Sequence, residues 1–224
     1  MTTPRIMIAA QSSGSGKTTI SCGILQALVN RGLKVSSFKC GPDYIDPMFH
    51  KKVIGADSTN VDPFFSDDEQ LKYLFSRSAD RTDIAVIEGV MGFYDGSSLD
   101  SSKDSSCDIS LKLDAPVILI VDSSGSSYSA LAVLKGFMDL ERNNIKGVIF
   151  NRMSERVFDS IRHHVIDMGI TPIGYIPKMK DIKLESRHLG LVMPDEISDI
   201  KATLNEVANR FERTLDIDAI IKLA

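Results

Sequence analysis

A short run of glycine, serine, lysine and threonine near the N-terminus has the composition of a phosphate-binding loop. It follows an apolar run at residues 6–10, typical of a buried strand, and leads into a segment with helical spacing of apolar residues. Backbone N–H groups of such a loop turn inward around an anion, and the positive end of the following helix dipole points at the same place. The sequence therefore predicts a nucleotide site, with loop residues Ser13, Gly14, Ser15, Gly16, Lys17, Thr18 and Thr19.

Lys17 and Thr18 carry the side chains that phosphoryl chemistry needs at the start of this helix. We expect the Lys17 ammonium to contact the outer phosphates and the Thr18 hydroxyl to complete the coordination shell of Mg2+. Phosphate loops usually have a glycine where this chain has Gln11. The alternative is an ordinary Gly/Ser loop with a chance Gly-Lys-Thr, but the strand before it and the helix after it favour the nucleotide site.

A second group of charged residues follows a short strand predicted at residues 35–38. The loop that begins at Lys39 contains Asp43 and Asp46 among glycine and proline residues. In an open parallel sheet, ligands bind beyond the carboxyl ends of the strands, so we expect these side chains to face the same crevice as Lys17. The alternative is that both aspartates only stabilise turns.

A carboxylate also ends the next predicted strand. Four apolar residues at 84–87 lead to Glu88, and two glycines follow within four residues, which allows a ligand to approach the backbone closely. Mg2+ prefers oxygen ligands and keeps several waters, so Thr18, a carboxylate such as Asp43 or Glu88, and nucleotide phosphates would form a suitable shell. A surface glutamate at a strand end is the alternative.

The rest of the chain alternates between segments typical of strands and of helices. A helix within residues 60–81 is expected to bury Leu71, Leu74 and Phe75. The serine-rich residues 97–106 have no periodicity and are interpreted either as a mobile lid or as a plain surface loop. Further strands are predicted at 116–121, 147–150 and 173–176, and further helices near 128–142, 155–168, 195–213 and 216–223. This pattern predicts one α/β domain over residues 1–224, a doubly wound and mostly parallel sheet of the P-loop NTPase type with helices on both faces.

The composition narrows the class of partner. A net charge of -4 over 224 residues gives no electrostatic reason to expect nucleic acid. The sequence contains no apolar run of about eighteen residues, and it enters a strand with no signal peptide before it, so no membrane contact is expected. Cys22, Cys40 and Cys107 lie far apart without CxxC spacing, which favours a reducing cytoplasm.

Five segments, taken in order along the chain, form a more specific combination than the phosphate loop alone. They are SSGSGKTT, FKCGPDYIDP, IEGVMGFYDG, GVIFNR and ESRHLGL. Together they resemble the ATP-binding synthetase domain of the cobyrinic acid a,c-diamide synthase family, which is related to dethiobiotin synthetase. The second and third segments carry most of this resemblance, because many unrelated ATPases contain Gly-Lys-Thr. The resemblance covers nearly the whole chain.

The resemblance implies an enzyme that uses ATP and Mg2+ to amidate two acetate side chains of a modified tetrapyrrole. The substrate would be cobyrinic acid or, as in an archaeal branch of the family, nickel-sirohydrochlorin, and the carboxylate would be phosphorylated first. The residues implied are Lys17 and Lys39 for the phosphates, Thr18, Asp43 and Glu88 for Mg2+, and Asn151 for the adenine ring.

Other residues match family positions on the substrate side. Tyr44, Asp46 and Asp95 correspond to positions near the substrate carboxylates, while Arg187 and His188 would help to hold the acidic macrocycle. The residues expected to act in catalysis are Lys17, Lys39, Asp46 and Asp95.

The resemblance also implies a source of ammonia. Members of the family normally carry a C-terminal glutaminase domain, and neither Cys40 nor Cys107 lies in a G-x-C-x-G nucleophile elbow. We therefore expect ammonia to come from a glutaminase domain or subunit that is not part of these 224 residues. A homodimer is left open.

Two other functions are considered. A dethiobiotin synthetase would carboxylate a diamine with bicarbonate, and the GPDYIDP and RHLGL segments argue against it. A partitioning-type ATPase would act as a nucleotide-switched binding module. That class has an extra lysine near the start of its loop, where this chain has Ser12 and Ser13.

Overall fold

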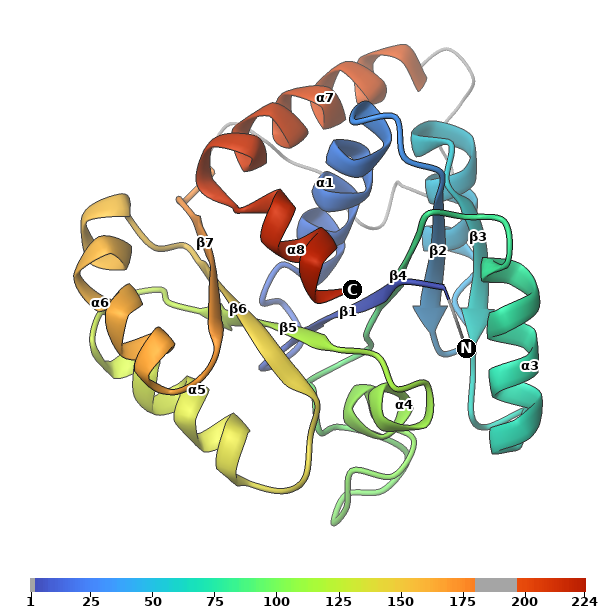
Figure 1. Cartoon of the computed structure of the whole chain (residues 1–224), viewed down its shortest axis with the longest axis horizontal. Coiled ribbons are helices and arrows are strands. Elements are labelled where there is room, and N and C mark those ends of the chain that lie inside the picture. Colours follow the sequence, from blue (N-terminus) through green and yellow to red (C-terminus); the bar gives the residue numbers. More distant parts are fainter. Residues whose placement is uncertain (1–2, 180–196) are drawn as a thin grey trace.

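A seven-stranded parallel sheet forms the centre of the computed structural model, which describes residues 3–179 and 197–224 (Figure 1). The order across the sheet is β3-β2-β4-β1-β5-β6-β7, and every neighbouring pair is parallel. The strands are β1 (Arg5–Ala10), β2 (Val35–Cys40), β3 (Asp57–Val61), β4 (Ile84–Glu88), β5 (Val117–Asp122), β6 (Ile145–Asn151) and β7 (Thr171–Ile176). The predicted α/β class and parallel sheet are confirmed.

Helices cover both faces of this sheet (Figure 1). One face carries α1, α7 and α8 together with the short α2 and η1, and the other carries α3, α4, α5 and α6. Their bounds are α1 (Lys17–Asn30), α2 (Ile45–Phe49), η1 (His50–Ile54, a π-helical turn), α3 (Asp68–Ala79), α4 (Ser106–Lys112), α5 (Ser129–Asp139), α6 (Glu155–Asp167), α7 (Ile197–Thr214) and α8 (Ile217–Leu223).

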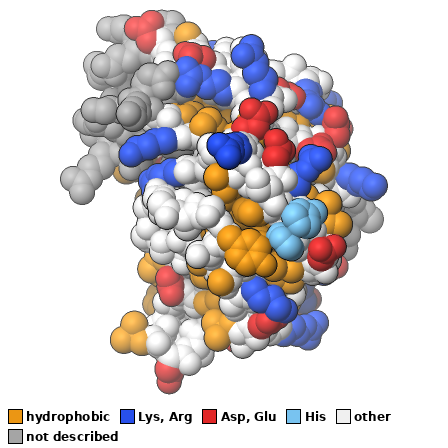
Figure 2. Space-filling model, turned by 90° about the vertical axis from the view of Figure 1, so that its left-hand side faces the viewer, with side chains coloured by type: hydrophobic (Ala, Val, Ile, Leu, Met, Phe, Trp, Pro, Cys, Tyr) orange, Lys and Arg blue, Asp and Glu red, His pale blue; other side chains and the backbone are white. Residues whose placement is uncertain are grey.

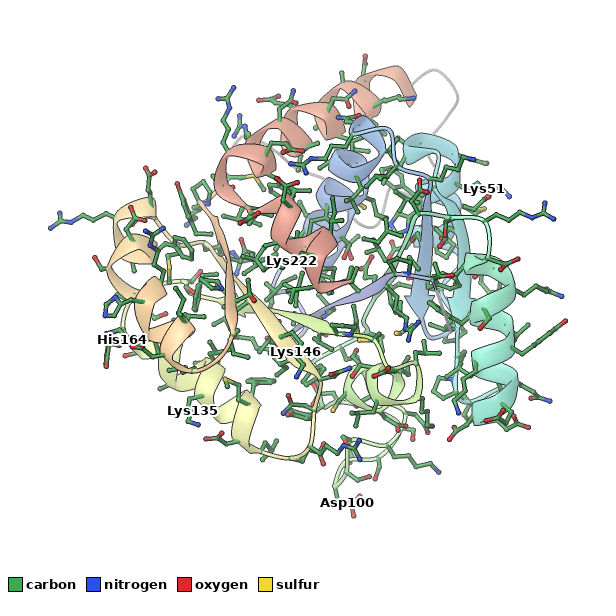
Figure 3. The ribbon with its side chains drawn as sticks, viewed as in Figure 1. Lys51, Asp100, Lys135, Lys146, His164 and Lys222 are labelled. Carbon is green, nitrogen blue, oxygen red and sulfur yellow. The ribbon has the colours of Figure 1, made fainter. Side chains whose placement is uncertain are left out.

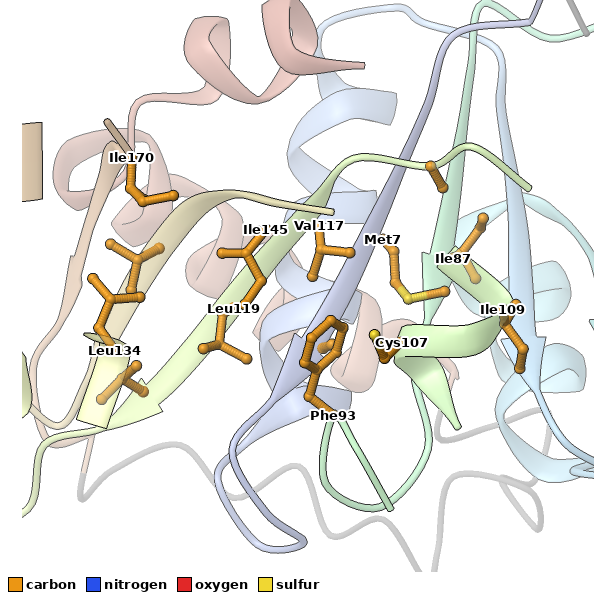
Figure 4. Packing of buried hydrophobic residues seen from close by; sticks show 14 of the residues in the cluster. Met7, Ile87, Phe93, Cys107, Ile109, Val117, Leu119, Leu134, Ile145 and Ile170 are labelled. Atoms are coloured by element: carbon orange, nitrogen blue, oxygen red, sulfur yellow. The ribbon is translucent and has the colours of Figure 1, made fainter. Parts of the chain in front are cut away.

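The two hydrophobic clusters meet at β1, the central strand. Successive side chains of a strand point to opposite faces, so Ile6 and Ile8 pack into the cluster under α1 and α7, whereas Met7 and Ala9 pack into the other. Figure 4 shows part of this second cluster, where Met7 lies near Phe93 and Cys107. Burial on both sides explains why β1 is a continuous apolar run.

The chain leaves the central strand in opposite directions. From β1 it passes through α1 to β2 on one side, and from β4 it later crosses to β5 on the other side of β1. In open α/β sheets this reversal marks the place beyond the carboxyl ends of the strands where ligands bind. The loops that follow β1, β2, β4 and β6 all lie at that edge.

Helix α3 corrects one detail of the expected core. Asp67 and Gln70 form a capping box that fixes its start, with Gln70 N donating to Asp67 Oδ1 at 2.8 Å. Leu71 and Phe75 are buried as predicted, but the prediction for Leu74 is wrong because its side chain is exposed. The buried stripe continues at four-residue spacing, which leaves Leu74 on the flank.

Four elements were not predicted from the sequence. Strand β3 lies at the edge of the sheet beside β2, and its first four residues alternate between exposed and partly buried positions, while Val61 at its end is buried. Helix α2 and the π-helical turn η1 follow β2 where only a loop was expected. Helix α4 begins at Ser106, the last residue of the serine-rich segment.

Most charged side chains lie on the outside of the molecule. Figure 3 shows Lys51, Lys135 and Asp100 extending away from the sheet, and Lys135 Nζ pairs with Asp139 at 2.8 Å within α5. Figure 2 shows one face on which Lys and Arg side chains are interspersed with Asp and Glu around small apolar areas. Within the described part of the chain, each helix is either too short or too polar to cross a bilayer.

Candidate active site

The loop after β1 is shaped to surround an anion. Gly14 and Gly16 have positive φ angles of 78° and 94°, a backbone conformation that glycine adopts without steric cost. Helix α1 starts directly after them, and among the described residues no side chain caps its first turn. The N–H groups at this helix start are therefore available to a phosphate, whose charge is favoured by the helix dipole.

Asn151 joins the end of β6 to this loop. Its Nδ2 donates to the carbonyl of Ser15 at 2.8 Å, and a Cβ placed on Gly16 would lie 2.6 Å from the same nitrogen. Asn151 is thus close to the phosphate loop. Its contact with an adenine ring stays a prediction.

Lys17 links the loop to the segment after β4. Its Nζ donates to the backbone carbonyl of Met91, which is itself held at a positive φ of 48°. Burial lowers the pKa of the Lys17 ammonium, with the charge of Glu88 acting in the opposite direction. A partly desolvated ammonium at this position is well placed to exchange the carbonyl for a phosphate oxygen.

Lys39 and two carboxylates form a buried charge cluster beside the loop. Lys39 Nζ lies 2.7 Å from Glu88 Oε1 and 2.5 Å from Asp46 Oδ2, and all three residues are nearly excluded from solvent. Burial alone would lower the pKa of Lys39, but the charges of Glu88 and Asp46 outweigh it and raise that pKa. Burial, followed by repulsion from Glu88, raises the pKa of Asp46 to about 6.

Thr18 connects the phosphate loop to this cluster. Its Oγ1 donates to Glu88 Oε1 at 2.9 Å, so one carboxylate oxygen accepts from both Thr18 and Lys39. Two residues predicted as Mg2+ ligands are therefore in direct contact. The third, Asp43, points one oxygen towards Lys39 Nζ at 4.0 Å.

Asp43 combines the two roles that the sequence left open. Its Oδ1 accepts from the backbone N–H of Ile45 at 2.8 Å, which stabilises the turn into α2. Its side chain also lines the pocket in front of the phosphate loop. Turn formation and a place at the site are thus properties of the same residue.

This pocket has a volume of about 360 Å3 and lies between the loop, the end of β2 and the segment after β4. Of the predicted loop residues, Ser15 is buried behind the pocket wall and the others line it. The lining residues are Ser13, Gly14, Gly16, Lys17, Thr18, Thr19, Lys39, Asp43, Gly89, Val90 and Met91. Cationic side chains, a hydroxyl and backbone N–H groups together suit a polyphosphate.

The same residues fit a hard divalent cation that is held mainly by phosphates. No three of the described His, Cys, Asp and Glu side chains form a group that could hold a metal unaided. Mg2+ usually needs only one or two carboxylates, with phosphates and waters completing its shell. Glu88 Oε1 accepts from the Thr18 hydroxyl, so these two oxygens lie close enough to serve one ion, while Glu88 Oε2 is buried and finds no hydrogen-bond partner in the described part of the chain.

A larger hollow of about 580 Å3 adjoins the phosphate pocket, and Ser13 and Met91 belong to both. Asp95 lines this second hollow, and its Oδ2 accepts from the backbone N–H of Gly92 at 3.0 Å. Asp95 is therefore next to the phosphate pocket rather than in it. Tyr44 is 77% exposed and lines neither hollow. Arg187 and His188 lie outside the described residues.

Sequence reasoning missed two polar groups at this edge. Arg152 donates from Nη2 to the Gly14 carbonyl at 3.2 Å and also pairs with Asp122 at the end of β5. Its position directly after Asn151 at a strand end was the available signal. His50 is wholly buried behind Glu88, and burial lowers its pKa. The signal for His50 was weak, because it lies where a loop was expected.

Comparison with known proteins shows which family the sequence matches. The family described as "CobQ/CobB/MinD/ParA nucleotide binding domain" matches residues 6–192. Proteins named cobyrinate a,c-diamide synthase are 41% identical to this chain in Methanocaldococcus jannaschii over 98% of it, and 41% identical in Dehalococcoides mccartyi over 100% of it. The chain spans about half the length of the curated relatives it matches, 50% and 49% of these two.

Solved structures show the same fold at low identity. Chloroplast FtsY from Physcomitrella patens superimposes with a TM-score of 0.58 at 13% identity, over 91% of this chain and 66% of that one. The MinD cell division protein of Aquifex aeolicus has a TM-score of 0.55 at 15% identity, over 93% and 96%. The predicted P-loop NTPase type of fold is confirmed.

Proposed function

This chain belongs to the cobyrinate a,c-diamide synthase family, and we propose that it carries the ATP-dependent half of the amidation, which converts carboxylates of a tetrapyrrole into amides. The observation that carries the proposal is the contact of Thr18 and Lys39 with one oxygen of Glu88 beside the phosphate loop. This arrangement places a hydroxyl, an ammonium and a carboxylate where the terminal phosphate of a nucleoside triphosphate would lie.

The proposed chemistry has two steps. A substrate carboxylate oxygen attacks the γ-phosphorus of ATP, the bond to the β,γ-bridging oxygen breaks, and ADP leaves with that electron pair. Ammonia then attacks the acyl phosphate carbon, inorganic phosphate leaves, and the nitrogen loses a proton to give the amide. Positioning and charge neutralisation provide most of the catalysis in the first step.

Lys17 and Lys39 are proposed to neutralise the charge that develops during this transfer. Lys17 already crosses the pocket to the Met91 carbonyl, and Lys39 projects from the end of β2 with its ammonium fixed by carboxylates. Asp46, buried beside Lys39, is proposed to hold that ammonium in place. Because a fixed cation needs no reorganisation during the reaction, it stabilises the transition state more than a mobile one does.

Thr18, Asp43 and Glu88 are the proposed ligands of Mg2+. When bound, the ion would supply positive charge that reduces the repulsion between the phosphates and the attacking carboxylate. Thr18 and Asp43 line the phosphate pocket, and Glu88, which is buried and not part of its lining, accepts a hydrogen bond from Thr18. All three side chains offer oxygen ligands, which Mg2+ prefers, so they would hold the ion and through it orient the triphosphate.

The tetrapyrrole is proposed to approach from the side of the second hollow, where Asp95 lies. Cobyrinic acid and nickel-sirohydrochlorin are the two candidates. The family positions near the substrate carboxylates are Tyr44, Asp46 and Asp95, and those that would hold the macrocycle are Arg187 and His188. These assignments remain proposals. A cytoplasmic location and a homodimer are proposals as well.

Ammonia is proposed to reach the site from a glutaminase domain or subunit. The three cysteines of this chain are buried. Burial raises the pKa of Cys40 and of Cys107 to about 12, and it also raises that of Cys22. A thiol in this state is a poor nucleophile for glutamine at neutral pH.

The test is an amidation assay with each candidate tetrapyrrole. ADP release and product mass are measured with ATP, Mg2+ and ammonium, and one amide should form per ADP. Glutamine in place of ammonium should give no product with this chain alone. A parallel reaction with a diamine and bicarbonate tests the dethiobiotin alternative, and product only there would refute the proposed function.

A further inference from the structure

His50 is a buried imidazole that contacts the site from behind. It begins η1, directly after α2, and its Nε2 lies 3.5 Å from Cys22 Sγ and 4.0 Å from Glu88 Oε2. Its Nδ1 lies 2.7 Å from Ser37 Oγ. These contacts come from α1, β4 and β2, the three elements that also carry Thr18, Glu88 and Lys39.

A chain of hydroxyl groups favours one tautomer of His50. Ser58 Oγ on β3 donates to Ser37 Oγ at 3.4 Å, and the hydroxyl proton of Ser37 then has Nδ1 of His50, at 2.7 Å, as an acceptor. With Nδ1 accepting, the proton of the neutral ring would be on Nε2. This N–H faces Glu88.

Glu88 has one oxygen that needs such a donor. Its Oε1 accepts from Thr18 and Lys39, whereas Oε2 is buried and has no hydrogen-bond partner within residues 3–179 and 197–224. A buried acceptor without a partner is costly. His50 Nε2 lies 4.0 Å away, and closing that gap to an ordinary hydrogen bond requires a movement of about 1 Å.

We propose that His50 is a positioning residue for Glu88. Its Nε2–H donates to Oε2 when Mg2+ and nucleotide are bound, and this contact turns the carboxylate so that Oε1 faces the metal. The inference depends on the proposed function only for the assignment of Glu88 to Mg2+. The tautomer of His50 and the 4.0 Å approach of its Nε2 to Glu88 Oε2 do not depend on that assignment.

The tautomer is tested by long-range 1H–15N NMR on uniformly 15N-labelled protein. The chain has four histidines, and the signals of His50 are those that disappear in His50→Gln. We expect the Nε2–H tautomer, and we expect Ser37→Ala to weaken it. Ser36→Ala is the matched control, since Ser36 is equally buried on β2 but bonds to Thr82. An Nδ1–H tautomer in the unaltered protein overturns the proposal.

The role is tested by the Mg2+ dependence of binding of a fluorescent ATP analogue. His50→Leu should raise the half-saturating Mg2+ concentration about tenfold, as loss of a residue that orients a metal ligand commonly does. His50→Gln should recover part of this, because its amide can donate a hydrogen bond. Cys22→Ala, which removes the other neighbour of Nε2, should behave like the unaltered protein.

Two results would overturn the role of His50 without touching the amidation reaction. They are an unchanged Mg2+ requirement in His50→Leu, or an equal shift in Cys22→Ala. If His50→Leu does not fold, as judged by circular dichroism, the tautomer measurement decides the question. Absence of amidation together with the expected Mg2+ shift would instead refute the proposed function and leave the proposal for His50 standing.

Discussion

Lys39 and Glu88 are register partners on adjacent parallel strands, and their side chains meet at 2.7 Å between Nζ and Oε1. The pairing of β2 with β4 therefore fixes the distance between a cation and a carboxylate of the site. Asp46 joins the pair from α2, so one ammonium balances two buried carboxylates. The charge balance of the site and the stability of the fold depend on the same contact.

Replacing the Lys39 ammonium with an uncharged side chain should destabilise the fold. Lys39→Met leaves Asp46 and Glu88 buried without their partner, and we expect the free energy of unfolding to fall by about 3–5 kcal/mol. Urea unfolding measures it. The control is Lys135→Met, whose exposed pair with Asp139 should contribute no more than about 1 kcal/mol. Equal losses in the two variants would show that the buried cluster contributes no special stability.

Asp46 should make stability depend on pH in the mildly acidic range. Its pKa in the folded chain is about 6, against 3.8 for an ordinary aspartate. The folded state therefore binds more protons between these values, and stability falls as pH rises from about 4 to about 6. Relative to Asp46→Asn, which does not titrate, the unaltered protein should lose on the order of 3 kcal/mol over this range. Urea unfolding at several pH values measures the difference, and parallel curves would contradict the raised pKa.

The phosphate loop should not tolerate a side chain at Gly16. A Cβ there would lie 2.6 Å from Asn151 Nδ2, at a φ of 94°. We expect Gly16→Ala to cost about 1–2 kcal/mol of stability and to weaken ATP binding about tenfold, a change measured by calorimetry. Gly136→Ala is the control, because nothing lies within 4 Å of its Cβ position in α5. It should be stabilising by about 0.5–1 kcal/mol.

Lys17 should matter for turnover more than for folding. It is half-buried, and its hydrogen bond to the Met91 carbonyl is a single replaceable contact. We expect Lys17→Ala to lower kcat by about a hundredfold or more in the ammonium-dependent assay. Its melting temperature should change little, which a thermal scan checks. A variant that keeps its rate would exclude Lys17 from phosphoryl transfer.

Glu88→Gln tests the metal assignment directly. The amide preserves the shape of the side chain but removes its charge, so Mg2+ should bind more weakly and turnover should fall at every Mg2+ concentration. Steady-state rates over a Mg2+ series measure both effects. Glu69→Gln, at an exposed position on α3, is the control. A wild-type rate across the series would rule out Glu88 as a ligand.

The parts of the fold that were predictable from the sequence have strong local signals. Buried strands such as β1 and β5 are continuous apolar runs, and such a run is by itself enough to predict a buried parallel strand. Strand β3 lacks this signal because it is polar and lies at the edge, where pairing with β2 alone holds it. The exposure of Leu74 depends on which neighbours α3 meets, and that is a tertiary property.

The candidate site also divides into features with a local sequence signal and features that depend on tertiary contacts. Lys17, Thr18, Lys39 and Glu88 follow or end strands, so topology alone predicted that they meet, and the structure brings them together. Their partners were harder to foresee. Lys17 bonds to a backbone carbonyl, which every residue has, so the sequence could not indicate this contact. His50 comes within 4.0 Å of Glu88 only because of the fold of η1, which was not predicted.

Met91 belongs to the walls of both hollows, and its carbonyl holds Lys17. When an incoming triphosphate draws Lys17 to itself, Lys17 must release the Met91 carbonyl. We therefore expect the second hollow to change shape when nucleotide binds. The chain has no tryptophan, and a Leu99→Trp reporter on the far rim would reveal the change as a fluorescence shift on adding Mg-ATP, with an unmoved spectrum arguing against it. The order in which the two reactants load would then be set by one lysine changing its hydrogen-bond acceptor.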